Sequence, residues 1–138
     1  MTQEQQTAVK AVEEKQDLLG RVADEIWEYA ELSLQEVKSA ECYCQVLEEE
    51  GFRVERGICG IDTAFSAEFG NGSPRIGILA EYDALSGLSQ EAGSLERKEL
   101  ISGGCGHGCG HNLLGAGALG AALGVKAYLE KTGHPGTV

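Results

Sequence analysis

The sequence predicts an α/β protein, because helical and strand patterns alternate along its 138 residues. Its first third carries apolar residues at helical spacing, and short runs bounded by Gly, Asn and Pro follow. A long apolar segment near the carboxyl end is typical of a buried helix. A buried helix after a buried strand requires a return strand, which would begin near Thr137. We therefore expect an incomplete α/β domain, the amino-terminal part of a longer one.

Two helices are expected first. The apolar residues of the first helix recur at spacings of three, four and seven, at Val9, Val12, Leu19, Val22, Ile26 and Ala30. Ser33 and Glu36 have the spacing of a capping box that opens a second helix, which ends at Gly51. Cys42 and Cys44 lie two residues apart in this second helix, and we interpret both as small packing residues.

Three strands and a long loop are expected next. Residues 52–56, 64–69 and 75–81 have strand composition, and Asn71-Gly72 is a good hairpin turn between the last two runs. The run from Ile76 to Ala80 is nearly continuous in apolar character, which is typical of a strand covered on both faces. Residues 82–110 show no periodicity, and a loop of that length in a compact domain is usually functional or disordered.

A third helix is expected from Asn112, a good N-cap residue, to about Lys131, with Gly133 just after its end. Its first three turns are apolar all round, which predicts burial. A stripe of small residues would let another backbone approach closely, at Gly117, Gly120, Ala121 and Gly124. Residues 134–138 are typical of a turn that enters a strand.

The composition excludes several classes of protein. Eleven Lys and Arg stand against 22 Asp and Glu, giving a net charge of −11. No basic stripe exists for nucleic acid or an anionic membrane. The start lacks a signal-peptide pattern, and the longest apolar run, residues 113–125, is shorter than a membrane span. Five cysteines, an odd number, argue against a disulfide framework. We expect a soluble, cytoplasmic protein.

The strongest functional signal lies between residues 103 and 111, where Cys105, His107, Cys109 and His111 alternate with glycines. Thiolate and imidazole groups are ligands of zinc and similar metals. In an extended conformation all four side chains could point the same way, and alternating glycines let the backbone fold tightly around an ion. The segment therefore predicts a metal site.

Carboxylates for a catalytic site must come from elsewhere in the chain. Residues 100–125 include no charged side chain, so a divalent cation there would meet only imidazoles and ionised thiols. Glu81 and Asp83 follow the apolar run of residues 76–80, at the carboxyl end of the expected strand. Open α/β sheets place their ligands at that edge, which makes these two residues the candidates.

The same residues resemble a known family. The motif Gly-Cys-Gly-His-Asn-Leu-Leu-Gly, preceded by Gly-Ile-Leu-Ala-Glu-Tyr-Asp-Ala-Leu, is similar to the metal-dependent amidohydrolases of the aminoacylase and carboxypeptidase G superfamily. Within that superfamily the motifs resemble the p-aminobenzoyl-glutamate hydrolase branch. The resemblance extends from about Asp17 onward. It implies a three-layer αβα sandwich around a mixed sheet, of which residues 1–138 would be the amino-terminal portion, without the lid and dimerisation domain.

The resemblance also implies roles for individual residues. Cys109 and His111 would be metal ligands, Glu81 and Asp83 would have catalytic roles, and His107 would support the ligands from behind. Two divalent ions, zinc or manganese, would assist hydrolysis of a small-molecule amide such as p-aminobenzoyl-glutamate, an acyl-amino acid or a dipeptide. The general base and the remaining ligands would lie outside this chain. We therefore expect the isolated chain to be inactive and the full-length protein to be a homo-oligomer.

A second interpretation stays open at this point. Cys105, His107, Cys109 and His111 could close a four-ligand structural site in a non-catalytic metal-binding or interaction module. Four ligands spaced two residues apart are cramped for a tetrahedron, compared with the paired spacings usual in structural zinc sites. This crowding favours the enzyme interpretation.

Overall fold

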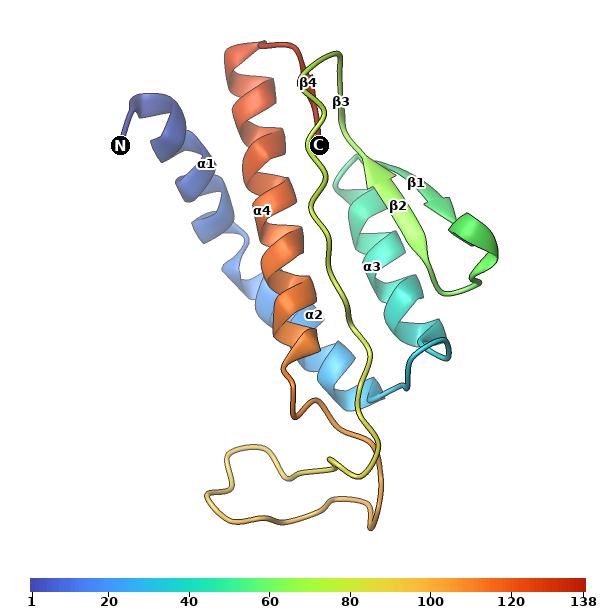
Figure 1. The fold of residues 1–138 in the computed structure, drawn as a ribbon. Coiled ribbons are helices and arrows are strands. Elements are labelled where there is room, and N and C mark those ends of the chain that lie inside the picture. Colours follow the sequence, from blue (N-terminus) through green and yellow to red (C-terminus); the bar gives the residue numbers. More distant parts are fainter.

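The chain contains both helices and short strands, so the protein is of the mixed α/β class that the sequence predicts. The computed structural model describes residues 1–138 (Figure 1). Its helices are α1 (Gln3–Glu14), α2 (Gln16–Tyr29), α3 (Val37–Glu49), the 3-10 helix η1 (Ile58–Gly60) and α4 (His111–Thr132). Its strands are β1 (Arg53–Arg56), β2 (Phe65–Glu68), β3 (Gly70–Asn71) and β4 (Gly136–Thr137).

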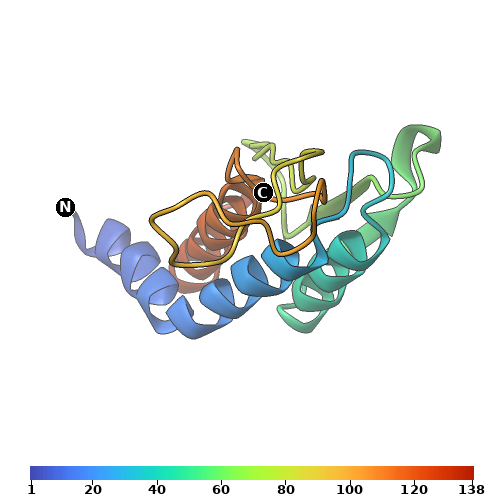
Figure 2. The same ribbon diagram turned by 90° about the horizontal axis from the view of Figure 1, so that it is seen from below.

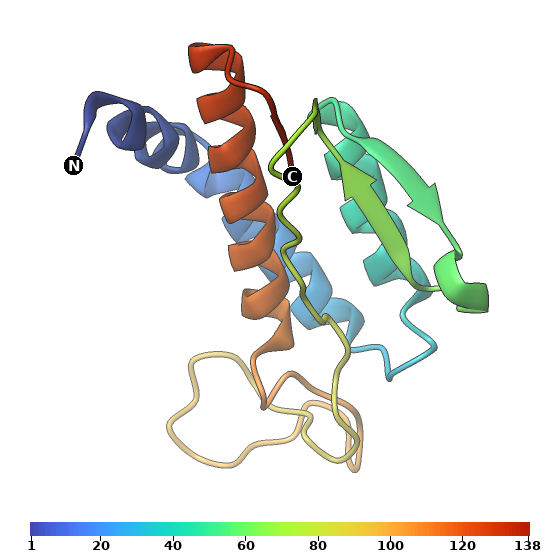
Figure 3. The same cartoon turned by 45° about the horizontal axis from the view of Figure 1, so that its top comes forward.

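Helix α4 runs through the middle of the molecule. Helices α1 and α2 pack along it on one side, and an extended segment, residues 75–81, follows it on the other (Figures 1 and 3). Small residues allow this packing. A Cβ at Gly120 would lie 3.1 Å from Leu19, and one at Gly124 would lie 3.1 Å from Val12. The predicted close approach is therefore confirmed at these two positions, whereas Gly117 faces open space.

The expected first helix is in fact two helices. Helix α1 ends at Glu14 and α2 begins at Gln16, with Lys15 between them in a non-helical conformation. The Lys15 ammonium forms an ion pair with Glu50 at 2.5 Å. Figure 2 shows the two helix axes at an angle to each other. The apolar periodicity continues across the break, which is why the pattern alone predicts one helix.

The predicted capping box at the start of α3 does not form. Glu36 is the N-cap residue, but its side chain makes no cap hydrogen bond, and its buried carboxylate accepts a hydrogen bond from Thr63 at 2.8 Å. Glu31 takes the capping role from the preceding loop. Its carboxylate accepts hydrogen bonds from the backbone N–H groups of Lys38 and Ser39, at 3.0 and 2.9 Å.

Two of the three predicted strands form, and they pair with each other. Strands β1 and β2 are antiparallel, with Arg53 opposite Glu68 and Arg56 opposite Phe65. The predicted hairpin at Asn71-Gly72 is wrong. Strand β3 pairs instead with β4, near the end of the chain.

The third predicted strand, residues 75–81, is extended but is not part of a sheet. Its backbone pairs at one end only, where Ile76 donates to Thr137 at 2.9 Å. Residues 77–82 make no backbone hydrogen bond, and Leu79 is 92% exposed. The expectation of a strand covered on both faces is wrong, because a strand requires hydrogen-bonded neighbours along its edges. The predicted return near Thr137 is confirmed by the parallel bridge with Arg75.

Helix α4 begins one residue earlier than predicted, after Gly110 in the left-handed conformation. Asn112 is not its N-cap residue. It lies buried in the first turn, where its amide donates to the Ala23 carbonyl of α2 at 3.1 Å. The helix ends before Gly133, as predicted. Its first turns are only partly buried, because Leu113 is 65% exposed.

The length and apolar composition of α4 are also those of a membrane-spanning helix. Core helices of globular domains share both properties. Because α4 packs along α1 and α2, and contributes Leu119 and Leu123 to the largest apolar cluster, we interpret it as the core helix of the domain.

Candidate metal centre

Three of the predicted site residues meet where the extended segment ends and α4 begins. His111 Nδ1 lies 2.8 Å from Asp83 Oδ1 and 3.1 Å from the Asp83 carbonyl oxygen. His111 Nε2 lies 3.3 Å from Glu81 Oε2. One ligand atom from each of the three residues lies within 4.8 Å of the others. The His111 and Asp83 side chains are largely buried, whereas that of Glu81 is 63% exposed, so the cluster opens toward solvent on the Glu81 side.

The backbone that carries both carboxylates is held in place by the residues next to them. Tyr82 lies between Glu81 and Asp83 in the chain, and its hydroxyl donates to the Thr63 carbonyl. The buried residue Ala84 follows Asp83, and its N–H donates to the Glu31 carbonyl at 2.7 Å. These anchors tie the end of the extended segment to the β2 and α3 regions. The sequence carries no local sign of them, because each partner lies far along the chain.

His111 is held from its own helix. It is the first residue of α4, directly after Gly110, whose left-handed conformation ends the loop. The next residue, Asn112, is bonded to α2 and fixes the rotation of the first turn. A helix start set in this way keeps the His111 ring facing Asp83.

His107 is not part of this cluster. Its Nε2 lies 2.9 Å from the Ile26 carbonyl of α2, and its Nδ1 is buried without a hydrogen-bond partner. Burial lowers the pKa of the His107 imidazole, and the hydrogen bond to Ile26 opposes that shift only in part. Its side chain therefore joins the loop to α2, and no hydrogen bond links it to Glu81 or Asp83.

The two loop cysteines also lie outside the cluster. Cys109 is exposed and Cys105 is half-buried, and neither belongs to a group of converging ligand atoms. The structure therefore does not bring together the four alternating Cys and His residues. The loop is not an extended strand with one ligand-bearing face, because its residues turn repeatedly between Gly103 and Gly110, both at positive φ.

The alternating glycines have a different structural reason. The two arms of the loop pair with each other, since Leu85 and Gly106 exchange backbone hydrogen bonds at 3.0 Å. A Cβ at Gly106 would lie 2.0 Å from the Leu88 carbonyl oxygen, and one at Gly108 would lie 2.6 Å from the Leu88 side chain. Glycine at these positions allows the two arms of the loop to approach each other closely. The glycines therefore serve the packing of the loop and not the wrapping of an ion.

The donor set fits a divalent metal ion. Two carboxylates and one imidazole are ligands that zinc and manganese both accept. The Asp83 carboxylate accepts a hydrogen bond from Nδ1, so in the neutral ring the proton is on that nitrogen. Nε2 then has a free lone pair, which faces Glu81. His111 Nε2 and Glu81 could hold the ion, with Asp83 orienting the imidazole.

An apolar groove of about 760 Å³ adjoins the cluster. Glu81 and Asp83 are among its lining residues, and its walls include Tyr43, Phe65 and Leu119. Its lining residues come mainly from the extended segment, α4 and β2. The candidate metal centre therefore has an apolar surface beside it.

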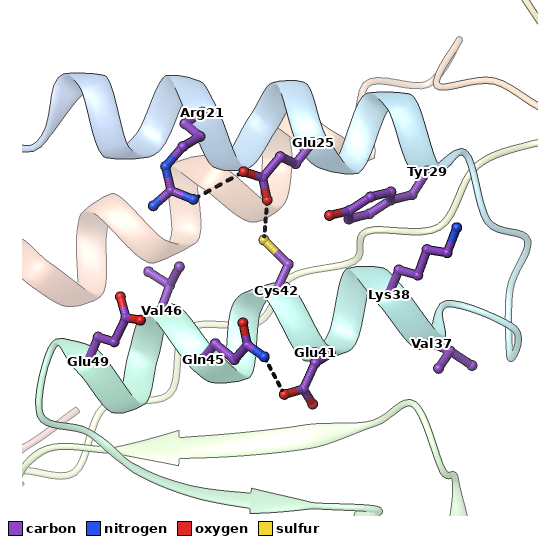
Figure 4. A pocket seen from close by; sticks show the side chains of 10 residues that line it. All are labelled: Arg21, Glu25, Tyr29, Val37, Lys38, Glu41, Cys42, Gln45, Val46 and Glu49. Carbon is purple, nitrogen blue, oxygen red and sulfur yellow. Dashed lines mark hydrogen bonds and ion pairs between the residues drawn. The ribbon is translucent and has the colours of Figure 1, made fainter.

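A separate depression of about 450 Å³ lies between α2 and α3 (Figure 4). Its polar groups bond to one another, since Glu25 accepts hydrogen bonds from Arg21 at 3.1 Å and from the Cys42 thiol at 3.3 Å. Burial raises the pKa of Cys42 to about 12, so this thiol is protonated at neutral pH. The packing role predicted for Cys42 and Cys44 agrees with their burial.

Comparison with known proteins finds relatives that are hydrolases by name. No family model matches the chain. It is 47% identical over 128 residues to a subunit of p-aminobenzoyl-glutamate hydrolase from Escherichia coli (strain K12), a match that covers 93% of this chain and 27% of that protein. The chain is a homologue of this hydrolase. The resemblance inferred from its motifs is thereby confirmed.

More distant relatives are also hydrolases by name. Xaa-Arg dipeptidases of Mus musculus and Homo sapiens are 29% and 28% identical to the chain, again over 93% of its length. The match covers 28% of each dipeptidase. The chain thus spans just over a quarter of the length of these curated relatives.

Proposed function

We propose that this chain carries part of the active site of a metal-dependent hydrolase that cleaves an amide bond to an amino acid. The observation that carries this proposal is the convergence of Glu81, Asp83 and His111 within 4.8 Å, in a homologue of named hydrolases. The three residues come from two segments of the chain, and Asp83 and His111 are 28 residues apart. Their proximity is therefore a property of the fold.

The proposed roles follow from the geometry. His111 Nε2 and the Glu81 carboxylate bind a zinc or manganese ion, and Asp83 holds the imidazole in the required tautomer. When bound, the ion would polarise the scissile carbonyl as a Lewis acid and would activate water. The resemblance adds Cys109 as a further ligand, and its exposure two residues before His111 leaves its thiol accessible to an ion. It also implies a second ion in the full-length protein.

The proposed substrate is a small amide, either p-aminobenzoyl-glutamate, another acyl-amino acid or a dipeptide. These classes follow from the names of the relatives, which are a p-aminobenzoyl-glutamate hydrolase and two Xaa-Arg dipeptidases. By the resemblance, the general base lies outside residues 1–138, so the isolated chain is proposed to be inactive. The full-length protein is proposed to be a cytoplasmic homo-oligomer that binds neither nucleic acid nor membranes.

A structural four-ligand site is the competing function. The arrangement of the loop disfavours it, because His107 is bonded to Ile26 and Cys109 is exposed. A closed site would require four converging ligands. Only His111 of that set lies in the observed cluster.

Zinc titration of the 138-residue chain by calorimetry tests the proposal. His111→Ala is expected to abolish binding, because it removes the central ligand. His134→Ala is the matched control: His134 lies beyond α4 and bonds only to Tyr128 and Thr132, so zinc affinity should be unchanged. Cys105→Ala should also leave binding unchanged. Loss of zinc binding in Cys105→Ala as complete as in His111→Ala would support the four-ligand site instead.

A further inference from the structure

Gly115 occupies a crowded position one turn after His111 on α4. A Cβ at this position would lie 2.1 Å from the Tyr43 hydroxyl oxygen, 2.8 Å from its Cζ and 3.4 Å from the Glu81 carbonyl oxygen. Real Cβ atoms essentially never approach another atom within 3.0 Å. Gly117, two residues later on the same helix, would meet nothing within 4 Å. Helix α3, α4 and the end of the extended segment therefore meet at Gly115.

Tyr43 cannot easily move out of the way, because its buried ring packs against two other aromatic rings. The ring is 3% exposed, and its centroid lies 5.3 Å from that of Tyr82 and 6.3 Å from that of Phe65. The rings of Phe65 and Tyr82 stack on each other at 6.0 Å. We call these three residues the aromatic cluster. The Tyr43 hydroxyl is buried without a hydrogen-bond partner, so packing alone sets its position.

The aromatic cluster reaches the candidate metal centre through Tyr82. This residue lies between Glu81 and Asp83, and its hydroxyl is bonded to the Thr63 carbonyl. Any displacement of the Tyr82 ring therefore shifts the backbone that carries both carboxylates. Ligand geometry in metal sites is sensitive to such supporting contacts.

We propose that the aromatic cluster, seated against Gly115, holds Glu81 and Asp83 in position beside His111, so that Gly115 and Tyr82 are positioning residues of the metal centre. This inference rests on the proposed function, because it assigns a support to the same site. Gly115 fits the role for a physical reason: any larger residue pushes Tyr43 against Tyr82 and so moves the two carboxylates away from the helix.

Zinc titration of two alanine variants tests the inference. Both Gly115→Ala and Gly117→Ala raise the helix propensity of α4 equally, but only the first creates a contact with Tyr43. Gly115→Ala is expected to weaken zinc binding by roughly 10-fold or more, the range seen when supporting residues of metal ligands are lost. Gly117→Ala should stay within about twofold of the parent chain. Circular dichroism verifies that both variants keep their helices.

A rescue separates positioning from general destabilisation. Tyr43→Phe removes the atom that a Cβ at position 115 would meet first and leaves Cζ at 2.8 Å, so a partial rescue is expected. In the Tyr43→Phe background, the loss of zinc affinity caused by Gly115→Ala should be at least about threefold smaller than in the parent background. A loss of equal size in both backgrounds would overturn the proposed contact.

A second pair of variants probes the same support without changing α4 packing. Tyr82→Phe keeps the ring but loses the hydrogen bond to Thr63, and it is expected to weaken zinc binding several-fold. Tyr128→Phe is the control, because the Tyr128 hydroxyl is bonded to His134 at the far end of α4. Unchanged zinc affinity in Tyr82→Phe would contradict the inference, even if Gly115→Ala does not fold.

The outcomes distinguish this inference from the proposed function. Suppose that His111→Ala loses zinc binding while Gly115→Ala and Gly117→Ala bind zinc with equal affinity. That result overturns the positioning role alone. A parent chain that binds no zinc through His111 overturns the proposed metal centre, and the positioning role with it.

Discussion

The imidazole of His111 and the carboxylate of Asp83 form a hydrogen bond between residues 28 positions apart, with 2.8 Å between Nδ1 and Oδ1. The same imidazole faces Glu81 through its other nitrogen, at 3.3 Å. The two nitrogens of the ring therefore have different roles. Nδ1 bonds to the Asp83 carboxylate, which orients the ring, and Nε2 faces Glu81, where an ion could bind.

Asp83→Asn tests this division of roles. An amide at position 83 can donate to Nδ1, which favours the tautomer with its proton on Nε2 and removes the lone pair that an ion requires. We expect zinc affinity to fall by roughly 10- to 100-fold. Nitrogen NMR of the imidazole should show the tautomer change directly. Asp62→Asn, at an exposed turn, is the control, and an equal effect in both variants would contradict the assignment.

The cap of α3 provides a stability prediction. Glu31→Ala removes the acceptor of the Lys38 and Ser39 N–H groups and of the buried Ser39 hydroxyl. The free energy of unfolding, measured with urea, should fall by about 1–3 kcal/mol. Ser33→Ala should change it by less than about 0.5 kcal/mol, since the predicted capping box is not formed. A larger fall in the free energy of unfolding for Ser33→Ala than for Glu31→Ala would show that the capping box does form.

Stability should decline at alkaline pH. Burial raises the pKa of Cys42 from 9.0 to about 12, and burial raises the pKa values of the Tyr43 and Tyr82 hydroxyls above their usual range. Between pH 9 and 12 the unfolded chain loses the Cys42 proton while the folded chain keeps it. The folded state then binds more protons, so stability falls as pH rises, by about 1.4 kcal/mol per pH unit for one such group.

Urea unfolding at several pH values between 8 and 11 measures this decline. Cys42→Ala should flatten the slope, because it removes one of the groups whose titration is suppressed by folding. Cys59→Ala is the matched control, since Cys59 is exposed. Stability that stays constant over this range in the parent chain would show that the three groups are not shielded from solvent.

Hydrogen exchange tests the pairing of the extended segment. The Ile76 amide donates to Thr137 at 2.9 Å, whereas the amides of residues 77–80 have no backbone partner. Ile76 should therefore exchange at least about tenfold more slowly than Ile78 and Leu79 in the folded chain. Slow exchange at all of these amides would mean that the segment pairs with another strand, for example in a second molecule.

Much of the fold could be predicted from local patterns. The periodicity of α2 and α3, the glycines after α3 and α4, and the two strands on either side of η1 all appear in short windows of sequence. The loop from residue 82 to 110 and the return near Thr137 were also predictable, because they follow from missing periodicity and from chain connectivity.

The candidate site could be predicted in part. Glu81, Asp83 and His111 stand out by residue type and by their place at element ends, and the structure brings them together. Cys109 and His107 share the same motif but face solvent and α2, respectively. Their orientation depends on turns at Gly103 and Gly110 and on contacts to the opposite arm of the loop, which no spacing rule describes.

By itself, the sequence determined which segments are helical, where the long loop lies and which residue types are available for chemistry, because each of these depends on neighbours a few positions away. Only the tertiary structure decided that Glu31 caps α3, that the chain bends at Lys15 and that residues 77–82 remain unpaired. These outcomes depend on hydrogen-bond and packing partners that are distant in the chain. Such partners compete with local motifs for the same backbone groups, and the partner with the better hydrogen-bond geometry and burial forms the contact.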